Sequence, residues 1–260
     1  MSLDTCLLYV SSEHAVSRSD SRYRLTIPNT VFVDKCVKLV VHTITIENIF
    51  PNINKYRNTW EEKTGGTKSI TIKNYTASEL ITAFNAASSE FVLSLNGDGK
   101  FVITSTTNTT IYTTGHRDLF DLLGFQDQVQ TVGNVHPLAV NTTSLTANTV
   151  PNLGGEKLVF IRSNQLVDAN LCHGGDGTLH DVMTCIPLSE TNYGFSKSVR
   201  ANDLFIDDVE YRDEKNINTI YFEILDSKFR PLDMPSNYHL RMVLKVFHKE
   251  HKPSLKEGGR

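Results

Sequence analysis

Apolar and polar residues alternate along the last third of the chain. Ile220, Phe222 and Ile224 are separated by Thr219, Tyr221 and Glu223, and a second alternating run extends from Leu240 to Val246. A period of two is typical of strands that bury one face of a sheet. Between the two runs, Pro231 cannot lie in a central strand because it has no N–H for the ladder. The pattern therefore predicts a sheet in this region.

The pattern of the first fifty residues predicts a polar N-terminal segment followed by further strands. A short strand begins at Arg22, and the β-branched run Val37–Ile49 predicts a long one. The serine-rich residues 1–21 predict a flexible N-terminal arm. Within the arm, Cys6–Val10 is apolar and suited to a strand. Two roles for this run are open, addition to the sheet edge of a second copy or a return onto its own sheet.

The middle of the chain carries local signals of a small α+β unit. Thr76 followed by Glu79 forms a capping box, so a helix is expected with Leu80, Ile81, Phe84 and Ala87 on one face. Asn96-Gly97-Asp98-Gly99 predicts a hairpin turn, because glycine permits positive φ. A second short helix is expected to end at Gly124, with Phe125 in the contact that accompanies a left-handed cap.

These patterns together predict a mainly β fold with an inserted lobe. We expect residues 22–54 and 152–249 to share one sandwich, residues 55–151 to form an inserted α+β lobe, and residues 250–260 to form a C-terminal tail. The connection Asn58–Gly66 is polar and contains glycine, which favours a loop there.

Composition narrows the class of protein. With 39% hydrophobic and 21% charged residues, the chain has the composition of an ordinary globular protein, and its apolar runs are too short to span a bilayer. A net charge of -3 and a pI near 6.3 disfavour a dedicated nucleic-acid binder. No basic segment precedes Cys6–Val10, so synthesis in the cytosol is expected. The cysteines lack the spacing of a disulfide framework and are expected as buried thiols: Cys6, Cys36, Cys172 and Cys185.

The sequence shows no established catalytic motif. No phosphate-binding loop, nucleophile elbow or HExxH helix occurs, so we expect no enzyme and assign no catalytic, cofactor-binding or metal-binding residue. One cluster leaves a metal site, a reactive cysteine and a plain glycine-rich loop before a strand all open: Cys172, His173, His180, Asp181 and Cys185. Asn96–Lys100 resembles part of a calcium loop but lacks the downstream acid. The acidic run Asp207–Glu214 is expected to be a solvated loop.

The order of short motifs resembles the penton, or minor capsid, proteins of Polinton/Maverick elements, adintoviruses and virophages. The matching features are a strand ending in Ser-Asn with a leucine two residues on, a Val-Met…Ile-Pro strand, a Tyr-Gly pair, an Ile-x-Phe-x-Ile-Leu-Asp strand and turn, and a Pro-Leu-Asp segment. In this chain they are Ser163, Asn164 and Leu166; Val182, Met183, Ile186 and Pro187; Tyr193 and Gly194; Ile220–Asp226; and Pro231–Asp233. The chain departs from the pattern at Lys73-Asn74-Tyr75, where relatives favour glycine before the tyrosine.

The resemblance implies a jelly-roll capsid subunit that forms a homopentamer at five-fold vertices and contacts a major capsid protein. It implies location in the virion. The composition and the absence of motifs add that we expect no cofactor, no membrane span and no dedicated nucleic-acid binding. The resemblance also raises the question whether Gly258-Gly259 is processed by the cysteine proteases that accompany such elements. The alternative from a different class is a receptor- or glycan-binding knob of a viral fibre or spike, which would also be β-rich and free of catalytic motifs.

Overall fold

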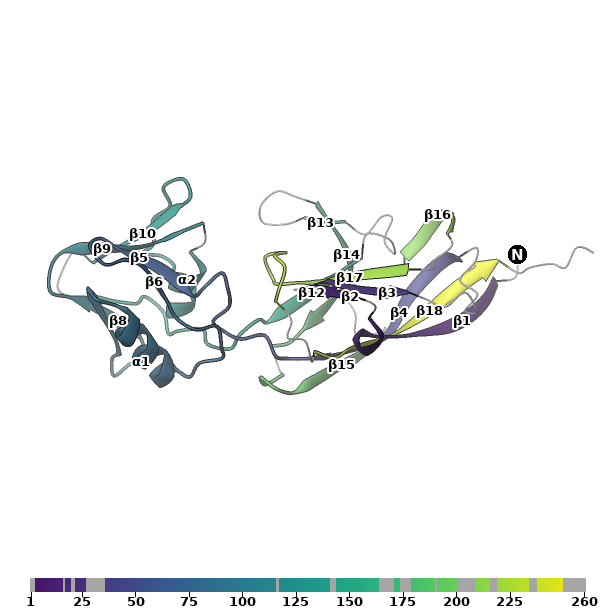
Figure 1. The fold of residues 1–260 in the computed structure, drawn as a ribbon, viewed down its shortest axis with the longest axis horizontal. Helices are drawn as coiled ribbons and strands as arrows, with labels where there is room; N and C mark the ends of the chain where they lie inside the picture. Colours follow the sequence, from purple (N-terminus) through teal and green to yellow (C-terminus); the bar gives the residue numbers. More distant parts are fainter. Residues whose placement is uncertain are drawn as a thin grey trace, which may run out of the picture. The chain divides into compact units, whose positions relative to one another are not determined.

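The computed structural model describes most of the chain, and it divides the chain into two compact units. One unit comprises Met1–Ile49 and Lys157–Arg260, and the other comprises Phe50–Glu156 (Figure 1). We call them the jelly-roll unit and the lobe. The described residues are 3–15, 17–19, 22–26, 36–115, 117–140, 144–163, 171–173, 179–189, 191–200, 209–215, 219–233 and 238–249.

The jelly-roll unit contains two antiparallel sheets. Sheet A has the order β1 (Leu3–Ser11), β18 (Leu240–Lys249), β4 (Cys36–Glu47) and β15 (Ser196–Arg200), and β16 (Val209–Lys215) also pairs with β4. Sheet B has the order β13 (Leu171–His173), β14 (Leu179–Pro187), β12 (Leu158–Arg162), β17 (Thr219–Leu225), β3 (Arg22–Thr26) and β2 (Ser17–Ser19).

The strand order is that of a jelly roll. Along the chain, the principal strands are β1, β3, β4, β12, β14, β15, β17 and β18, which we number 1 to 8. In this numbering sheet A runs 1-8-3-6 and sheet B runs 5-4-7-2. Two four-stranded sheets wound in this way from eight strands form the double-sheet sandwich of jelly rolls. The predicted mainly β fold is confirmed.

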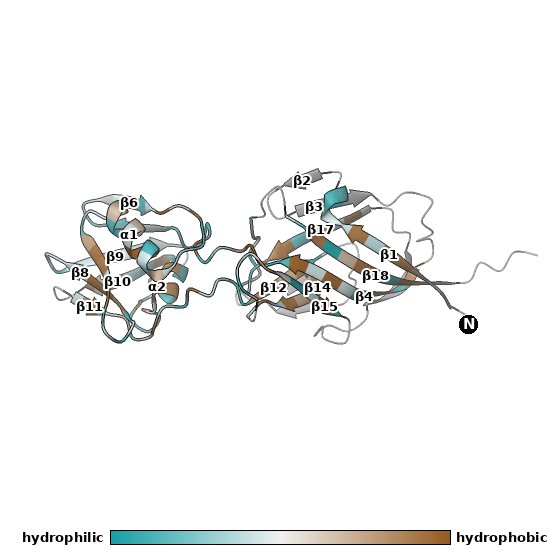
Figure 2. Cartoon of the chain, turned by 90° about the horizontal axis from the view of Figure 1, so that it is seen from below, coloured by the Kyte–Doolittle hydropathy of each residue, from teal (hydrophilic) through white to brown (hydrophobic). Residues whose placement is uncertain are grey.

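Each sheet buries the face that its alternating pattern predicts. Ile220, Phe222 and Ile224 of β17 are fully buried, and the even-numbered residues of β18 from Leu240 to Val246 are buried as well. Figure 2 shows hydrophobic and hydrophilic bands along β17 and β18. Burial of each such side chain contributes about 1.5–3 kcal/mol. The two faces therefore form the core of the sandwich.

The N-terminal segment belongs to this sandwich, so the prediction of a flexible arm over residues 1–21 is wrong for its described part. β1 pairs with β18 from Leu3 to Ser11 without a break in register, and Leu8 and Val10 are buried. A 3-10 helix, η1 (Ser12–His14), follows, and Ser12 Oγ donates to Tyr238 O and accepts from Leu240 N, both at 2.9 Å. The run Cys6–Val10 therefore returns onto its own sheet. Its partner there is β18, which comes from the other end of the sequence.

The lobe combines two small sheets and two helices. One sheet has the order β10 (Val135–Val140), β9 (Thr109–Thr114), β5 (Thr59–Glu62) and β6 (Gly66–Ser69), and the other has the order β11 (Ser144–Thr146), β8 (Phe101–Ser105) and β7 (Phe91–Leu95). The helices are α1 (Ala77–Ala87) and α2 (Asp118–Leu123). The predicted loop at Asn58–Gly66 is wrong, because it contains β5 with Trp60 buried.

The local signals of the lobe are confirmed. The capping box at the start of α1 is complete, with Thr76 N donating to Glu79 Oε2 at 2.8 Å and Glu79 N to Thr76 Oγ1 at 3.3 Å. Leu80 and Phe84 of α1 are fully buried, and the Phe84 ring stacks on Trp60 with centroids 4.4 Å apart. Gly124 ends α2 with a φ of 92°. The compact lobe extends a few residues beyond the expected range of 55–151 at both ends.

Candidate interaction surfaces

The cysteine and histidine cluster of the sequence falls on the β13–β14 hairpin. In the backbone register Cys172 pairs with His180 and Leu171 with Asp181. The side chains of Cys172, His173, His180 and Asp181 lie outside the described residues. Cys185 is buried with Phe160, Val182 and Leu225, and Cys36 is also buried, as expected of structural thiols. Among the residues that the structure describes, no three His, Cys, Asp or Glu side chains gather as metal ligands would.

The Asn96–Lys100 segment is a hairpin turn. Asn96 Oδ1 accepts hydrogen bonds from the backbone N–H of Asp98 at 3.0 Å and of Lys100 at 2.9 Å, and Gly99 has a φ of 74°. The Asn96 side-chain oxygen, which would be a ligand in a calcium loop, instead stabilises the turn that joins β7 to β8. Of the acidic run, residues 209–214 lie in β16, a strand and not the expected loop, and residues 207–208 lie outside the described chain.

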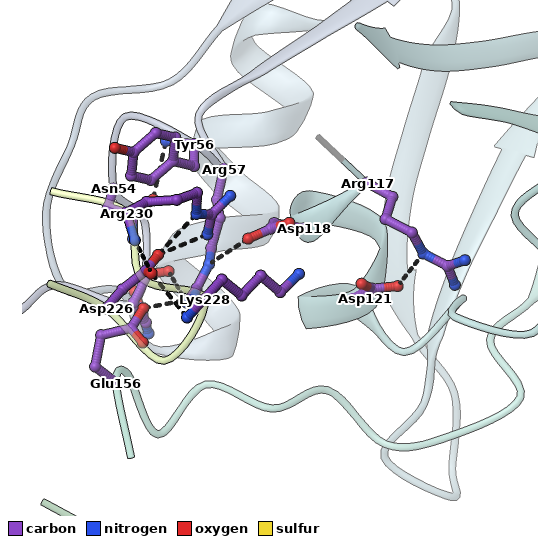
Figure 3. Close-up of polar contacts among 11 residues, drawn as sticks. Asn54, Tyr56, Arg57, Arg117, Asp118, Asp121, Glu156, Asp226, Lys228 and Arg230 are labelled. Carbon is purple, nitrogen blue, oxygen red and sulfur yellow. Dashed lines mark hydrogen bonds and ion pairs between the residues drawn. The ribbon is translucent and has the colours of Figure 1, made fainter. Parts of the chain in front are cut away.

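One motif that carries the family resemblance, the strand and turn Ile220–Asp226, has a structural role. Asp226, at the end of β17, is fully buried. Its Oδ1 accepts from the N–H groups of Lys228 at 2.8 Å and Arg230 at 2.9 Å, and its Oδ2 from the Arg230 guanidinium at 2.7 Å (Figure 3). This turn places Phe229, at a φ of 60°, on the ring of Phe160 with centroids 4.4 Å apart. Ser163 is buried, whereas Asn164 and Leu166 lie outside the described residues.

The face of sheet B that points away from the core is therefore partly covered by its own turn. Phe160, Val182, Cys185 and Leu225 form a small apolar cluster with Phe229 packed against it. Beside it, Arg162 and Glu223 form an ion pair between neighbouring strands. We call this surface the outer face of sheet B.

The corresponding outer face of sheet A is more open. On β1, Leu7 is 48% exposed and Tyr9 is 74% exposed. In the register Leu7 lies opposite Lys245 and Tyr9 opposite Val243 of β18. Further along, Lys245 Nζ lies 5.0 Å from the centroid of the Phe247 ring. This face thus combines apolar side chains with basic ones, which suits contact with another protein.

A pocket of about 150 Å³ lies at one end of this face. Glu13 Oε1 is 3.0 Å from His239 Nδ1 and 3.1 Å from Arg241 Nη2. The hydrogen bond from Arg241 holds the pKa of Glu13 below its ordinary value. The pocket is open to solvent and carries both signs of charge, and the residues that line it are Glu13, Thr45, Glu47, Ser196, His239 and Arg241.

In the lobe, Glu62 is a buried carboxylate that no sequence motif indicated. Glu62 Oε1 accepts from Trp60 Nε1 at 3.1 Å and Ser88 Oγ at 2.5 Å, while Oε2 accepts from the N–H and hydroxyl of Ser89 at 3.1 and 2.8 Å. Burial raises the pKa of Glu62, but these hydrogen bonds together hold it below its ordinary value. Trp60 and Glu62 lie on one face of β5, because side chains two residues apart on a strand point the same way. This spacing is the signal in the sequence that could have placed Glu62 beside the buried Trp60.

A second set of polar contacts joins the first residues of the lobe to its last residues. Arg57 Nη2 lies 2.5 Å from Glu156 Oε1, and Arg57 Nε lies 3.9 Å from Asp118 Oδ2 (Figure 3). Asn52 Nδ2 donates to Tyr75 O at 2.7 Å and to Leu153 O at 3.0 Å. These contacts tie the first residues of the lobe to its last, which is a structural role.

No protein-family model matches the chain, and no curated protein matches it. Among solved structures, the chain is similar to one described as "Crystal structure of SeMet-labeled mavirus penton protein", with 16% sequence identity and a TM-score of 0.47 over 94% of this chain and 99% of that one. This structure is of the same class of protein that the order of the motifs resembles.

Proposed function

We propose that the protein is a structural protein of a viral capsid, and that it is the penton subunit that forms the five-fold vertices of an icosahedral shell. The observation that carries the proposal is the 1-8-3-6 and 5-4-7-2 strand order, which makes the jelly-roll unit a complete jelly roll. Jelly rolls occur in viral capsid subunits. Two motifs of the resemblance, Val182–Pro187 and Ile220–Asp226, lie in the strand β14 and in β17 with its turn, as motifs that specify a shared scaffold would.

The two outer faces of the sandwich support a ring. A closed ring needs two different surfaces on each subunit, because each copy contacts its two neighbours through opposite flanks. The outer face of sheet A exposes Leu7 and Tyr9 among basic residues, whereas the outer face of sheet B carries the Phe160–Phe229 stack and the Arg162–Glu223 pair. The faces thus differ in the way that a head-to-tail contact requires.

Stoichiometry tests the proposal directly. We expect the purified protein to be a pentamer by light scattering, or a monomer that forms five-fold particles when co-expressed with the major capsid protein of its own virus. Negative-stain images would show the five-fold symmetry. A stable trimer, with no five-fold particle across a range of salt concentrations, would exclude the penton assignment.

The proposal includes location in the virion after synthesis in the host cytosol, a non-enzymatic role and no cofactor. In the described part of the chain, no helix has the length and apolar character of a membrane span. The pI near 6.3 supports the absence of a dedicated nucleic-acid site. Processing at Gly258-Gly259, which lie outside the described residues, would be tested by mass spectrometry of particles, and intact Arg260 would exclude it.

A receptor- or glycan-binding knob is the second candidate, and one feature of the lobe favours it. Val132 is 65% exposed and Val135 38% exposed at a turn where Gly133 has a φ of 61°. Exposed apolar residues at a turn suit contact with a receptor, and jelly rolls also occur in lectins. A trimeric protein that binds a glycan array, with binding lost in a Val132→Ser variant, would favour the knob.

A further inference from the structure

The pocket on the outer face of sheet A is lined mostly by side chains of β18, β4 and β15, which are neighbours in that sheet. In the register Arg241 lies opposite Thr45, and Ser196 lies opposite Glu47. Glu13 of η1 completes the lining, and its ion pair with Arg241 at 3.1 Å holds it in place. The polar groups are therefore already positioned in the free protein, which lowers the cost of binding a ligand.

Two side chains of the pocket have hydrogen-bonding groups that the fold does not use. Within the described part of the chain, the carboxylate of Glu47 and the hydroxyl of Ser196 make no hydrogen bond or ion pair with another residue. The carboxylates of Glu62 and Asp226, in contrast, hold neighbouring segments together. A ligand can thus bond to Glu47 and Ser196 without breaking a contact of the protein.

The charges of the pocket favour a neutral ligand. An anion would meet the carboxylates of Glu13 and Glu47, and a cation would meet the guanidinium of Arg241, which stays charged. Hydroxyl groups can both donate and accept, so they can pair with the carboxylates, with Arg241 and with the hydroxyls of Thr45 and Ser196. A ligand that carries several hydroxyl groups and no charge therefore matches the whole lining.

The size of the pocket limits the ligand to one small ring. Its volume is about 150 Å³, whereas pockets for drug-sized ligands have roughly 300–1,000 Å³. A single sugar ring has the hydroxyl groups that the lining requires and leaves the rest of its chain in solvent.

Two exposed aromatic residues lie on the turn that leads to the pocket. Phe195 directly precedes Ser196, and both Phe195 and Tyr193 are exposed. The buried Asn48 fixes this turn, because its N–H donates to Phe195 O at 2.9 Å and its Nδ2 to Thr191 O at 2.5 Å. A fixed aromatic ring gives apolar contact area at a low entropy cost, and the C–H face of a sugar ring suits such a contact.

We propose that this pocket binds one ring of a neutral glycan, with Glu47 and Ser196 bonded to its hydroxyl groups and Phe195 packed against its apolar face. The site is separate from the proposed ring contact, since Leu7 and Tyr9 lie on β1, and β18 and β4 stand between β1 and β15. The failure of either proposal therefore leaves the other intact.

Saturation-transfer NMR on the full chain tests the ligand class with methyl glycosides of glucose, galactose, mannose and N-acetylglucosamine. We expect at least one to bind with a Kd of about 1–10 mM, in the range of a weak contact with few hydrogen bonds. The methyl glycoside of glucuronic acid should bind about tenfold more weakly than the best neutral sugar, because its carboxylate would meet Glu13 and Glu47. No binding of any neutral glycoside at about 50 mM, or tighter binding of the uronic acid, would overturn the proposal.

Variants of the pocket test its location. Glu47→Gln and Phe195→Ser should each weaken binding of the best glycoside about tenfold. Both should keep the melting temperature, because Glu47 holds no other described residue and Phe195 is exposed. The matched controls are Glu61→Gln and Val92→Ser, which make comparable changes on the lobe and should bind like the unchanged protein. Undiminished binding in both pocket variants would show that the sugar binds elsewhere.

Discussion

At the scale of single residues, Glu62 shows how the lobe combines charge with burial. Its carboxylate accepts four hydrogen bonds from Trp60, Ser88 and Ser89. Without it the buried Trp60 Nε1–H would lose its acceptor, and leaving one buried donor unsatisfied costs about 1–3 kcal/mol. A larger residue at Gly65 would collide with this carboxylate, because a Cβ there would lie 2.5 Å from Glu62 Oε2.

We therefore expect Glu62→Gln to destabilise the lobe by about 1–3 kcal/mol. The amide has one acceptor oxygen, and its NH₂ group would face the donors of Ser88 or Ser89. Trp60 is the single tryptophan of the chain and lies in the lobe, so its fluorescence during urea unfolding reports this change. Asp98→Asn, on the exposed hairpin turn, makes the same chemical change and should have no effect. Equal stability of the two variants would show that the carboxylate is dispensable.

The pH dependence of the lobe follows from the lowered pKa of Glu62. A carboxyl whose pKa is lower in the folded state stabilises the fold above its unfolded pKa of about 4.3, and this contribution is lost as the pH falls through the folded pKa. Trp60 fluorescence should therefore report a loss of stability below about pH 4 that is smaller in Glu62→Gln. An identical pH profile in the variant would exclude Glu62 as a source of the acid sensitivity.

Gly124 offers a test of backbone conformation. Its φ of 92° is unfavourable for other residues, and a Cβ there would lie 2.3 Å from the backbone oxygen of Thr149. We expect Gly124→Ala to cost about 2–4 kcal/mol from strain and overpacking. Gly97→Ala is the matched control, because nothing lies within 4 Å of its added Cβ. Thermal unfolding followed by Trp60 fluorescence should separate the two, and similar melting temperatures would contradict the expectation.

At the scale of elements, β1 is a strand with one buried and one exposed face. Leu8 lies in the core, whereas its neighbour Tyr9 is exposed. We expect Leu8→Ala to cost about 2–5 kcal/mol, as for other buried leucines, and Tyr9→Ala to change the stability of the monomer little. Calorimetry of the full chain measures both. If deletion of Met1–Ser11 left the melting temperature unchanged, β1 would contribute nothing to the jelly-roll unit.

The same elements show what a single sequence can predict. Capping by Thr76 and Glu79, the Gly99 turn and the Gly124 cap depend on residues within four positions, so they were predicted correctly. The pairing of β1 with β18 joins Leu3 to Lys249, and no local pattern in Cys6–Val10 indicates this partner. Alternation likewise places Leu7 and Tyr9 on one face, but only the packed sandwich decides that this face is exposed. The outer face of sheet A, with its exposed Leu7 and Tyr9, therefore could not be located from the sequence.

At the scale of the whole molecule, contacts within the lobe hold its first and last residues together. Asn52 bonds Leu153, and Arg57 pairs with Glu156, so the first and last residues of Phe50–Glu156 are held together by contacts within the lobe. Its core is also its own, since the cluster around Trp60, Phe84 and Phe120 contains only lobe residues. A chain with adjacent ends and a separate core meets the conditions for folding alone.

We therefore expect a fragment of residues 50–156 to unfold cooperatively, with a Trp60 fluorescence midpoint within a few degrees of that in the full chain. The reciprocal construction, with Ile49 joined to Lys157 by a short glycine–serine linker, should keep the jelly-roll unit folded, because β4 and β12 retain all their partner strands. Its stoichiometry by light scattering should match that of the full chain if the ring is built by the sandwich. An unfolded fragment would show that the lobe needs the jelly roll. A loss of assembly by the folded lobeless protein would instead place ring contacts on the lobe.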